Sequence, residues 1–538
     1  MKKKTTLVAL IVAIVVIAMA VIVTATGVDT YASFWALVPP VVAIGLALIT
    51  KEVYSSLFTG IVVGGILGCA GNAATAVDHV VSTGVIAAVE GTAGIFLFLV
   101  ILGVIVALIN RAGGSAAFGR WAKTHIKTRV GAQLATFALG ILIFIDDYFN
   151  CLTVGSVMLP VTDSHKVSRS KLSYLIDATA APICMIAPIS SWAAAVSSYT
   201  EGTGLSGIEL FIRAIPYNFY SLLTLVFVVA IVLMKADYGP MAKHERNSIE
   251  KGDLFSSKER VGGEETFANP RGRVVDLILP VVVLVFVSVI GLLYIGGFFG
   301  VDAWGGTECA GDFIAAFGNT DATVGLPWGA LIALIVIIAY LIGRKLLTFT
   351  DAMECVPQGF VAMVPAIMIL TLATALKNVS NDLLGSAAYV EMLMQSEAAQ
   401  NLQNLLPAVI FIVACLLAFA TGTSWGTFGI LIPIVSNMFG PTDPMLYIGM
   451  SACLAGAVCG DHCSPISDTT IMSSAGARCV HVMHVSTQLP YAISVAAISV
   501  ICFIVAGFVQ NAWICLALGV VLVLGFLFIM KKRSAKNA

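Results

Sequence analysis

The chain has 538 residues, of which 59% are hydrophobic and only 11% charged, and its net charge is −1 at pH 7. Soluble domains carry about 25% charged residues, so this composition excludes an ordinary soluble protein. Continuous apolar runs close to the roughly 20 residues that span a bilayer recur along the chain. They predict an all-α polytopic membrane protein and exclude a β-barrel, whose strands alternate. The lipid bilayer is the expected partner, and no nucleic-acid partner is expected.

The first apolar run, 7–25, follows Lys2, Lys3 and Lys4. It is longer than the apolar core of a signal peptide, which typically has about 7–15 residues, and therefore predicts a retained transmembrane helix. The sequence predicts the remaining spans near 34–50, 55–71, 93–110, 130–162, 174–200, 216–236, 274–296, 323–343, 357–376, 404–437, 446–475, 488–509 and 513–530.

Two of these segments, 130–162 and 404–437, are too long for a single crossing. Each has a polar interruption, DDYFN at 146–150 and TGTSW at 421–425. If both segments are hairpins that return to the side they enter from, all but two of the 29 Lys and Arg residues fall on the cytoplasmic side. The positive-inside rule therefore predicts about 12 full crossings, two re-entrant hairpins and both termini in the cytoplasm.

The two halves of the chain resemble each other in order. TVGSVMLP at 153–160 resembles GTFGILIP at 426–433, and APISS at 187–191 resembles SPISD at 464–468. An odd number of crossings in each repeat places the second repeat in the membrane upside down, which is a common plan of secondary transporters. The predicted division is 1–30, N-terminal transmembrane helix; 31–236, first transporter repeat; 237–273, cytoplasmic linker; 274–510, second, inverted repeat; 511–538, C-terminal transmembrane helix and basic tail.

Helix breaks are expected at corresponding places in the two halves. Pro182 and Pro188 interrupt 174–200, and we expect Gly456, Gly460 and Pro465 to loosen 446–475. A broken helix inside a membrane is tolerated only within protein or around a cavity. It exposes carbonyl groups, which suit a small cation, and helix N-termini, which suit an anion. The hairpin tips and breaks are therefore expected to form one site near mid-membrane.

The stretch CGDHCSPISDTT, 459–470, places two acids in this apolar region. Asp461 and Asp468 are seven residues apart, which in a continuous helix puts them on one face. A buried carboxylate can hold either a proton or a cation, and this exclusivity is enough to couple the two. The alternative is a structural hydrogen-bond network that fixes the break. His462 is either a proton relay or a packed histidine.

Oxygen-bearing side chains around the tips and breaks complete the predicted site, since oxygen ligands suit Na⁺. Of Asp146 and Asp147, we favour Asp147 as the residue that faces the site. Na⁺ is assigned to Asp468, Asp461 and Ser467, and proton coupling to Asp461, Asp468 and His462. The further ion- or substrate-binding candidates are Ser464, Thr469, Asp147, Asn150, Thr153, Ser190, Ser191, Thr423 and Ser424.

No cofactor is expected beyond the transported ions. Cys459, Asp461, His462 and Cys463 lie too close together in sequence to supply four zinc ligands, and no second CxxC helps them. The Walker A pattern is absent, so ion gradients rather than ATP are the expected source of energy. No nucleophile–base pair indicates an enzyme, and two oppositely facing hairpins disfavour the open pore of a channel.

GDHCSPISDTT, together with DDYFNCLTVG from residue 146 and TGTSWGTFGILIP from residue 421, resembles the NhaC-type Na⁺/H⁺ antiporter family. The resemblance covers roughly residues 35–510 and implies inverted repeats, re-entrant hairpins, and Na⁺ leaving as H⁺ enters. Relatives of that family exchange malate for lactate. The hydroxyl and aromatic residues of APISSWAAAVSSY, 187–199, suit an organic-solute pocket.

The sequence therefore predicts a secondary-active Na⁺/H⁺ antiporter that exports Na⁺ by alternating access. The alternative is a Na⁺- or H⁺-coupled transporter of a small organic solute, an amino acid or carboxylate, on the same fold. The expected location is the bacterial cytoplasmic (inner) membrane, with many crossings. A homodimer is left open as the assembly state.

Overall fold

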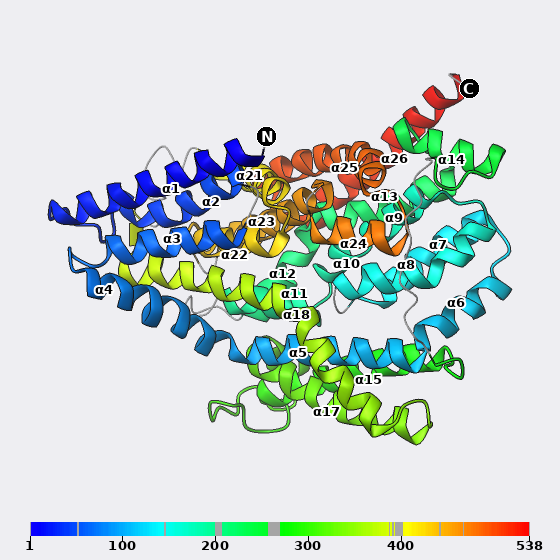
Figure 1. Ribbon diagram of the computed structural model, residues 1–538, viewed down its shortest axis with the longest axis horizontal. Coiled ribbons are helices and arrows are strands. Elements are labelled where there is room, and N and C mark those ends of the chain that lie inside the picture. Colours follow the sequence, from blue (N-terminus) through cyan, green and yellow to red (C-terminus); the bar gives the residue numbers. More distant parts are fainter. Residues whose placement is uncertain are drawn as a thin grey trace.

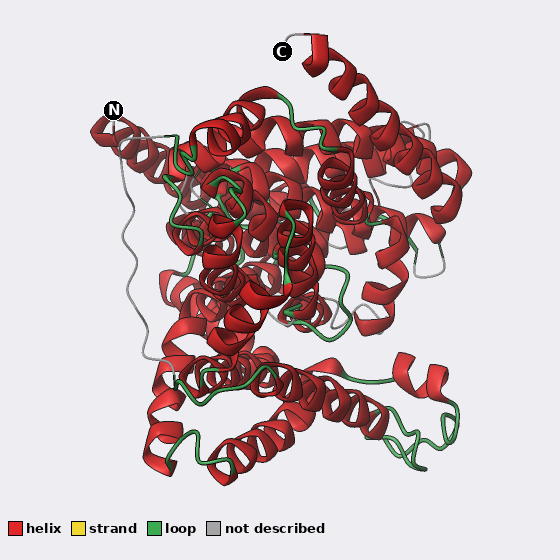
Figure 2. Cartoon of the chain, turned by 90° about the vertical axis from the view of Figure 1, so that its right-hand side faces the viewer, coloured by secondary structure: helices red, strands yellow, loops and turns green. Residues whose placement is uncertain are grey.

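The computed structural model describes residues 2–50, 53–144, 147–199, 207–256, 269–386, 388–389, 392, 402–440, 443–465 and 467–536. Their regular structure is helical, and no strand occurs among them (Figure 2). Within this part of the chain, 6 helices are long and apolar enough to cross a membrane, or up to 8 if each bent pair counts as one span. The predicted all-α membrane protein is confirmed, while the predicted number of crossings and their inverted arrangement stay predictions.

The first half of the chain begins with single helices and continues with a 40-residue run from Ala73 to Ala112. Its helices are α1 (Lys2–Ala25), α2 (Val38–Thr50), α3 (Val53–Leu67), α4 (Ala73–Asp78), η2 (His79–Ile86), α5 (Ala87–Ala112), α6 (Gly114–His125), α7 (Arg129–Leu142), α8 (Asp147–Ser164), α9 (Arg169–Asp177), α10 (Ala181–Cys184), α11 (Ser191–Tyr199), α12 (Gly207–Ala214) and α13 (Phe219–Met234). The short α10 lies between two interruptions, so the predicted span 174–200 is broken twice.

The second half contains the longest individual helices. Its helices are α14 (Gly239–Lys251), α15 (Val275–Ile295), α16 (Phe313–Gly318), α17 (Ala322–Gly343), α18 (Phe349–Asn378), η4 (Val379–Leu383), α21 (Leu406–Thr421), α22 (Ser424–Ser436), α23 (Pro444–Cys463), α24 (Asp468–Gly476), α25 (His481–Val509) and α26 (Ala512–Lys536). In Figure 1, α5, α15 and α17 lie together along one side of the molecule, and α18 packs on α5.

Large apolar side chains remain exposed on the outer helices. Phe286 on α15, Val361 on α18 and Trp513 on α26 are 65%, 69% and 73% exposed. Such surfaces are unfavourable in water and suit contact with lipid chains. Where the structure describes them, the polar side chains that the sequence singled out are instead buried between the central helices, where hydrogen bonds inside the protein replace those to water.

Both long segments divide at their polar interruptions, as predicted. The first becomes α7 and α8, and the second becomes α21 and α22. Gly422 ends α21 in the left-handed conformation, with φ of 70°, which glycine adopts without steric cost. The two arms of each segment pack against each other, as the arms of a hairpin do.

The predicted roles of Gly456 and Gly460 are wrong. Both lie inside α23, which runs without interruption to Cys463. A Cβ atom at Gly456 would lie 2.5 Å from the Phe411 carbonyl oxygen, and one at Gly460 would collide with the Cys415 carbonyl oxygen. The two glycines therefore let the backbone of α23 approach α21 closely, and the helix instead ends at Ser464 and Pro465.

A second glycine contact joins α8 to α24. A Cβ atom at Gly155 would lie 2.6 Å from the backbone carbon of Gly476, and one at Gly476 would lie 2.7 Å from the Cys151 carbonyl oxygen. One arm of each hairpin thus lies in close backbone contact with one of the two helices that flank the break at Pro465, which we call half-helices. Both belong to the predicted second repeat. For α21 that half-helix is α23, and for α8 it is α24.

The linker contains a helix, α14, that packs on the transmembrane part. Glu245 is buried and accepts a 2.9 Å hydrogen bond from the Ser168 backbone N–H, and it also pairs with Arg129 at the start of α7. Just before α14, the Tyr238 hydroxyl lies 2.9 Å from Ser494 Oγ on α25. The linker therefore binds elements of both predicted repeats.

We expect Gly460→Ala to destabilise the protein, because the added methyl group forces α21 and α23 apart. The expected cost of this overpacking is about 1–3 kcal/mol, read as a lower unfolding temperature of the detergent-solubilised protein. Gly525→Ala on α26 is the matched control, since no atom lies within 4 Å of the added Cβ. Equal unfolding temperatures for the two variants would contradict the close contact.

Candidate functional site

The tip of the second hairpin meets the break of α23 at Asp461. Ser424, the first residue of α22, donates a 2.7 Å hydrogen bond from Oγ to Asp461 Oδ2. Across the same contact, Ser464 Oγ donates a 2.7 Å bond to the Phe419 carbonyl oxygen. Asp461 and both serines are buried. These predicted site residues are therefore brought together, with two bonds tying the hairpin tip to the end of α23.

The local sequence explains why oxygen atoms gather here. The last carbonyl groups of a helix have no partner within it, and α23 ends at Cys463, where Pro465 prevents a regular continuation. α22 starts at the same place, with Thr423 Oγ1 accepting a 3.3 Å bond from the Gly426 N–H. Carboxylate, hydroxyl and carbonyl oxygens together are the ligand set of a hard cation.

The matched segments around Ser190 and Ser467 adopt the same local structure. Ser190 Oγ accepts a 3.2 Å bond from the Ala193 N–H, and Ser467 Oγ accepts a 3.4 Å bond from the Thr470 N–H. Each serine caps a nine-residue helix, α11 or α24, in the way that serine caps a helix N-terminus. Ser467 Oγ also lies 3.0 Å from Thr469 Oγ1. Ser191 and Thr469 are buried beside these caps.

The tip of the first hairpin is fixed by Asn150. Its Nδ2 atom donates to the carbonyl oxygens of Gly140, Ile143 and Thr179, at 2.7, 2.9 and 3.1 Å. Thr179 lies in the break after α9, so this tip is bound to the first break as the second tip is bound to the second. Predicted site residues Asp147 and Thr153 on α8 are buried nearby in sequence, whereas Asp146 lies outside the described residues.

The expectation of one continuous helical face for Asp461 and Asp468 does not apply, because α23 ends at Cys463 and α24 begins at Asp468. The break, with Pro465 in it, makes their relative placement independent of the helical repeat. Asp468 is the first residue of α24, and its side chain lies outside the described part of the structure, as does Ile466. Its role as a Na⁺ ligand and proton carrier stays a prediction.

His462 points its Nδ1 atom to the Tyr220 hydroxyl on α13, at 2.8 Å. Its ring stacks on Tyr174 of α9, with centroids 6.3 Å apart. Among the described residues, no group of three or more His, Cys, Asp and Glu side chains is placed to hold a metal ion. His462 therefore contacts aromatic residues of the first repeat.

A polar cluster that sequence analysis did not identify surrounds Asp177. From sequence, Asp177 could lie at the membrane interface or take part in transport. The structure buries it and surrounds it with Thr470 of α24 and with His484 and Gln488 of α25. The available signal was weak: His484 and Gln488 are four positions apart, on one face of α25, in a segment that also contains His481, Ser486 and Thr487.

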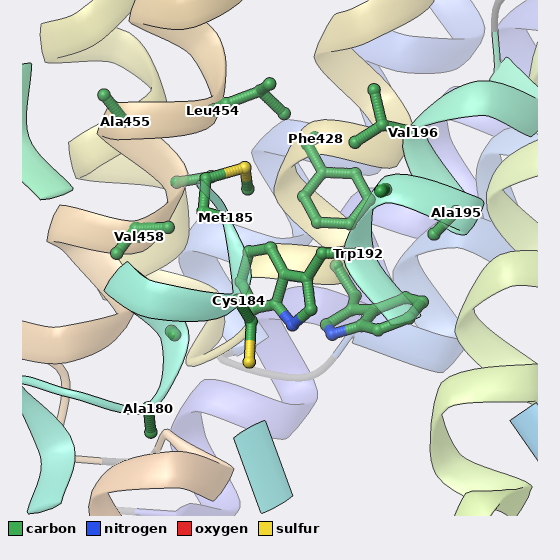
Figure 3. Packing of buried hydrophobic residues seen from close by; sticks show 14 of the residues in the cluster. Ala180, Cys184, Met185, Trp192, Ala195, Val196, Phe428, Leu454, Ala455 and Val458 are labelled. Atoms are coloured by element: carbon green, nitrogen blue, oxygen red, sulfur yellow. The ribbon is translucent and has the colours of Figure 1, made fainter. Parts of the chain in front are cut away.

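Two buried tryptophans lie in the first turns of α11 and α22. Trp192 and Trp425 are 0% and 2% exposed, and their rings meet edge to face with centroids 5.9 Å apart. Trp192 lies among Met185, Val196 and Phe428 (Figure 3). Neither indole N–H has a hydrogen-bond partner among the described residues. Each tryptophan is the second residue of its helix, where backbone N–H groups are also unpaired.

Lys171 lies within α9 and is buried there. Its side chain is 0% exposed, and Nζ lies 2.6 Å from Asp237 Oδ1. The Tyr491 hydroxyl donates to the same carboxylate oxygen at 2.8 Å, and the ammonium group lies 5.7 and 5.5 Å from the ring centroids of Tyr174 and Tyr491. Ion pairing and the two aromatic faces replace the hydration that burial removes.

Three comparisons with known proteins bear on this arrangement. Residues 179–508 match the model of the Na⁺/H⁺ antiporter family. An uncharacterized protein of Haemophilus influenzae is 35% identical over 526 residues, which cover 94% of this chain and 97% of that protein. The malate-2H⁺/Na⁺-lactate antiporter of Bacillus subtilis is 35% identical over 101 residues, or 19% of this chain and 21% of that protein.

The fold is also similar to that of the YdaH transporter of Alcanivorax borkumensis. The two superimpose with a TM-score of 0.53 at 11% sequence identity, covering 81% of this chain and 89% of the other. At this level of identity, the similarity concerns the fold alone.

We expect Asn150→Ala to destabilise the protein, because three buried carbonyl groups lose their shared donor. The expected cost is about 1–3 kcal/mol, measured as a lower unfolding temperature in detergent. Asn437→Ala is the matched control, since Asn437 Nδ2 makes one local bond to the Pro433 carbonyl oxygen. A smaller effect at Asn150 than at Asn437 would contradict the role of Asn150 in fixing the hairpin tip.

Proposed function

The chain belongs to the Na⁺/H⁺ antiporter family, and we propose that it exports Na⁺ in exchange for H⁺ by alternating access. It is a multi-pass membrane transporter rather than an enzyme. The proposed location is the bacterial cytoplasmic membrane, with both termini in the cytoplasm, because this orientation places nearly all Lys and Arg residues inside.

The observation that carries this proposal is the meeting of the second hairpin tip with the end of α23. The Ser424–Asp461 and Ser464–Phe419 bonds join two chain segments that are about 40 residues apart at a break inside the transmembrane part. A buried carboxylate at the C-terminal end of a helix, where the helix dipole is negative, creates negative potential. We assign Na⁺ to Asp461, with Ser467 and Asp468 as the further ligands that the sequence analysis names.

Exchange also needs a buried group that carries the proton. Sequence analysis assigns this role to Asp461, Asp468 and His462, on the principle that one carboxylate holds a proton or Na⁺ but not both. Asp461 and His462 are adjacent and buried at the end of α23. A proton that binds there competes with Na⁺ through direct charge neutralisation.

Two inverted repeats with re-entrant hairpins are the architecture that we propose for this exchange. The matching serine caps of α11 and α24 support it, as do the matching connections between each hairpin tip and the nearby break. Pro160 and Pro433, which end the matched apolar segments, lie inside α8 and α22. Alternating access then follows from a relative movement of the two repeats around a fixed central site.

The tryptophan pair favours a second candidate, the coupled transport of a small organic carboxylate. Trp192 and Trp425 present buried indole N–H groups without partners, at the N-termini of two half-helices. Such N-termini favour negative charge, and an indole N–H is a hydrogen-bond donor only. A carboxylate that accepts from both rings would satisfy them.

The first experiment is Na⁺-triggered proton movement in proteoliposomes that contain a trapped pH dye and no organic solute. We expect movement with the wild-type protein and its loss with Asp461→Asn or Asp468→Asn, because the neutral amides bind Na⁺ weakly. Asp321→Asn is the control, since Asp321 caps α17 and asparagine caps equally well. Absence of proton movement with active wild-type protein would contradict Na⁺/H⁺ exchange.

Trp192→Phe and Trp425→Phe separate the two candidate functions, because phenylalanine keeps an aromatic ring but lacks the N–H donor. If a carboxylate is the cargo, each variant should lose about 10-fold in apparent affinity for it. Solute-dependent Na⁺ uptake across a panel of small carboxylates and amino acids measures this loss. Na⁺/H⁺ exchange that persists without any solute, with equal rates in both variants, would exclude the carboxylate function.

A further inference from the structure

Asp177 is the centre of a polar cluster formed by side chains of α9, α24 and α25. Its Oδ2 atom accepts a 2.7 Å bond from Gln488 Nε2 and a 3.3 Å bond from Thr470 Oγ1. His484 Nε2 lies 3.1 Å from the same oxygen and 3.0 Å from Ser473 Oγ. Asp177, His484, Gln488 and Thr470 are all at most 1% exposed. The cluster joins α9 of the first predicted repeat to α24 and α25 of the second.

The cluster retains polar atoms whose hydrogen bonds are not made. His484 Nδ1 and Gln488 Oε1 are buried and have no partner among the described residues. A network that served only to fix the helix break would be expected to satisfy such atoms, since an unsatisfied buried polar group costs about 1–3 kcal/mol. Unused donor and acceptor capacity beside a buried acid indicates a place where the bonding pattern changes.

Asp177 and His484 form a pair that can bind one proton. An Asp carboxylate with a neutral imidazole carries a net charge of −1, and one added proton, on either side chain, brings the pair to zero. His484 Nε2 already faces the carboxylate, and the unpartnered Nδ1 is the atom through which a proton can enter or leave. Asp177 is the last residue of α9. The negative end of the helix dipole lies there and stabilises the positive charge that the added proton brings.

Gln488 connects the cluster to the proposed Na⁺ site. Its Nε2 atom donates both to Asp177 Oδ2 and to the carbonyl oxygen of His462, the residue that follows Asp461. A change in the charge of Asp177 therefore acts on a side chain that also binds the end of α23. This contact is a direct physical link between a buried acid and the backbone beside the Na⁺ ligand.

We propose that Asp177 and His484 together carry the proton that is exchanged for Na⁺, and that Gln488 is the positioning residue that couples this proton to the Na⁺ site. The inference rests on the proposed antiport function. It replaces the assignment of the proton to Asp461, Asp468 and His462: Asp461 then binds Na⁺, and the Asp177–His484 pair binds H⁺. Among the described side chains, the other titratable groups nearby are His462 and Cys463 of α23 and Tyr174 of α9, while α24 contributes Thr470 and Ser473.

The test compares two transport modes in the same proteoliposomes. Exchange of ²²Na⁺ for unlabelled Na⁺ needs Na⁺ binding and alternating access but no proton, whereas Na⁺-driven quenching of a trapped pH dye needs both ions. We expect Asp177→Asn and His484→Gln to keep Na⁺/Na⁺ exchange and to lose Na⁺-driven proton movement at least 10-fold. Their Na⁺/Na⁺ exchange should also lose the pH dependence that the wild type shows.

Matched variants distinguish proton carriage from structural support. Asp177→Glu keeps a titratable acid and should retain proton movement with a shifted pH profile. This variant therefore tests whether Asp177 carries the proton even if Asp177→Asn fails to fold. Gln488→Leu should shift the same profile, which a merely structural role would not do. His165→Gln, at a partly buried turn after α8, is the histidine control and should behave as the wild type.

Each remaining outcome overturns a defined part of the proposal. Wild-type proton movement that persists in Asp177→Asn and His484→Gln, with an unchanged pH profile, excludes the pair as the proton carrier. Loss of both transport modes in folded variants assigns the pair to Na⁺ binding or to the conformational change instead. Absence of Na⁺-driven proton movement in the wild type overturns the proposed function, and the present inference with it.

Discussion

The structure depends on how buried backbone groups are satisfied where helices break. Inside a membrane, water is not available to bind the carbonyl and N–H groups that a break releases. Side chains of other segments take its place: Asn150 binds the break after α9, Ser464 binds the hairpin end at Phe419, and Gln488 binds the end of α23. The same bonds that make the breaks tolerable also assemble the site.

The need to satisfy backbone groups at helix breaks explains which parts of the fold could be predicted from the sequence. A polar interruption in a long apolar segment has few structural explanations, so both hairpin tips and the break at Pro465 were found from sequence. Gly456 and Gly460 were misassigned because glycine both loosens a helix and permits close packing. Only the position of α21 decides between these roles, and that position is a property of the folded chain.

Residues of the candidate site were predictable to the extent that they lie close together in sequence. Asp461 and Ser464 belong to one short motif, and their partner Ser424 belongs to a matched polar interruption. Asp177 and His484 are about 300 residues apart and meet only through the packing of α9 against α25. A single sequence contains no signal for such a contact, since each residue by itself is compatible with an interfacial or a packed position.

The glycine contacts have a mechanical consequence. One hairpin is fastened to α23 through Gly456 and Gly460, and the other is fastened to α24 through Gly155 and Gly476. Only the short segment from Ser464 to Ser467 separates α23 from α24. Bending at this joint therefore changes the angle between the two hairpins while each stays fixed to its own half-helix. The polar motif of the candidate site thus also forms the joint between these two helices.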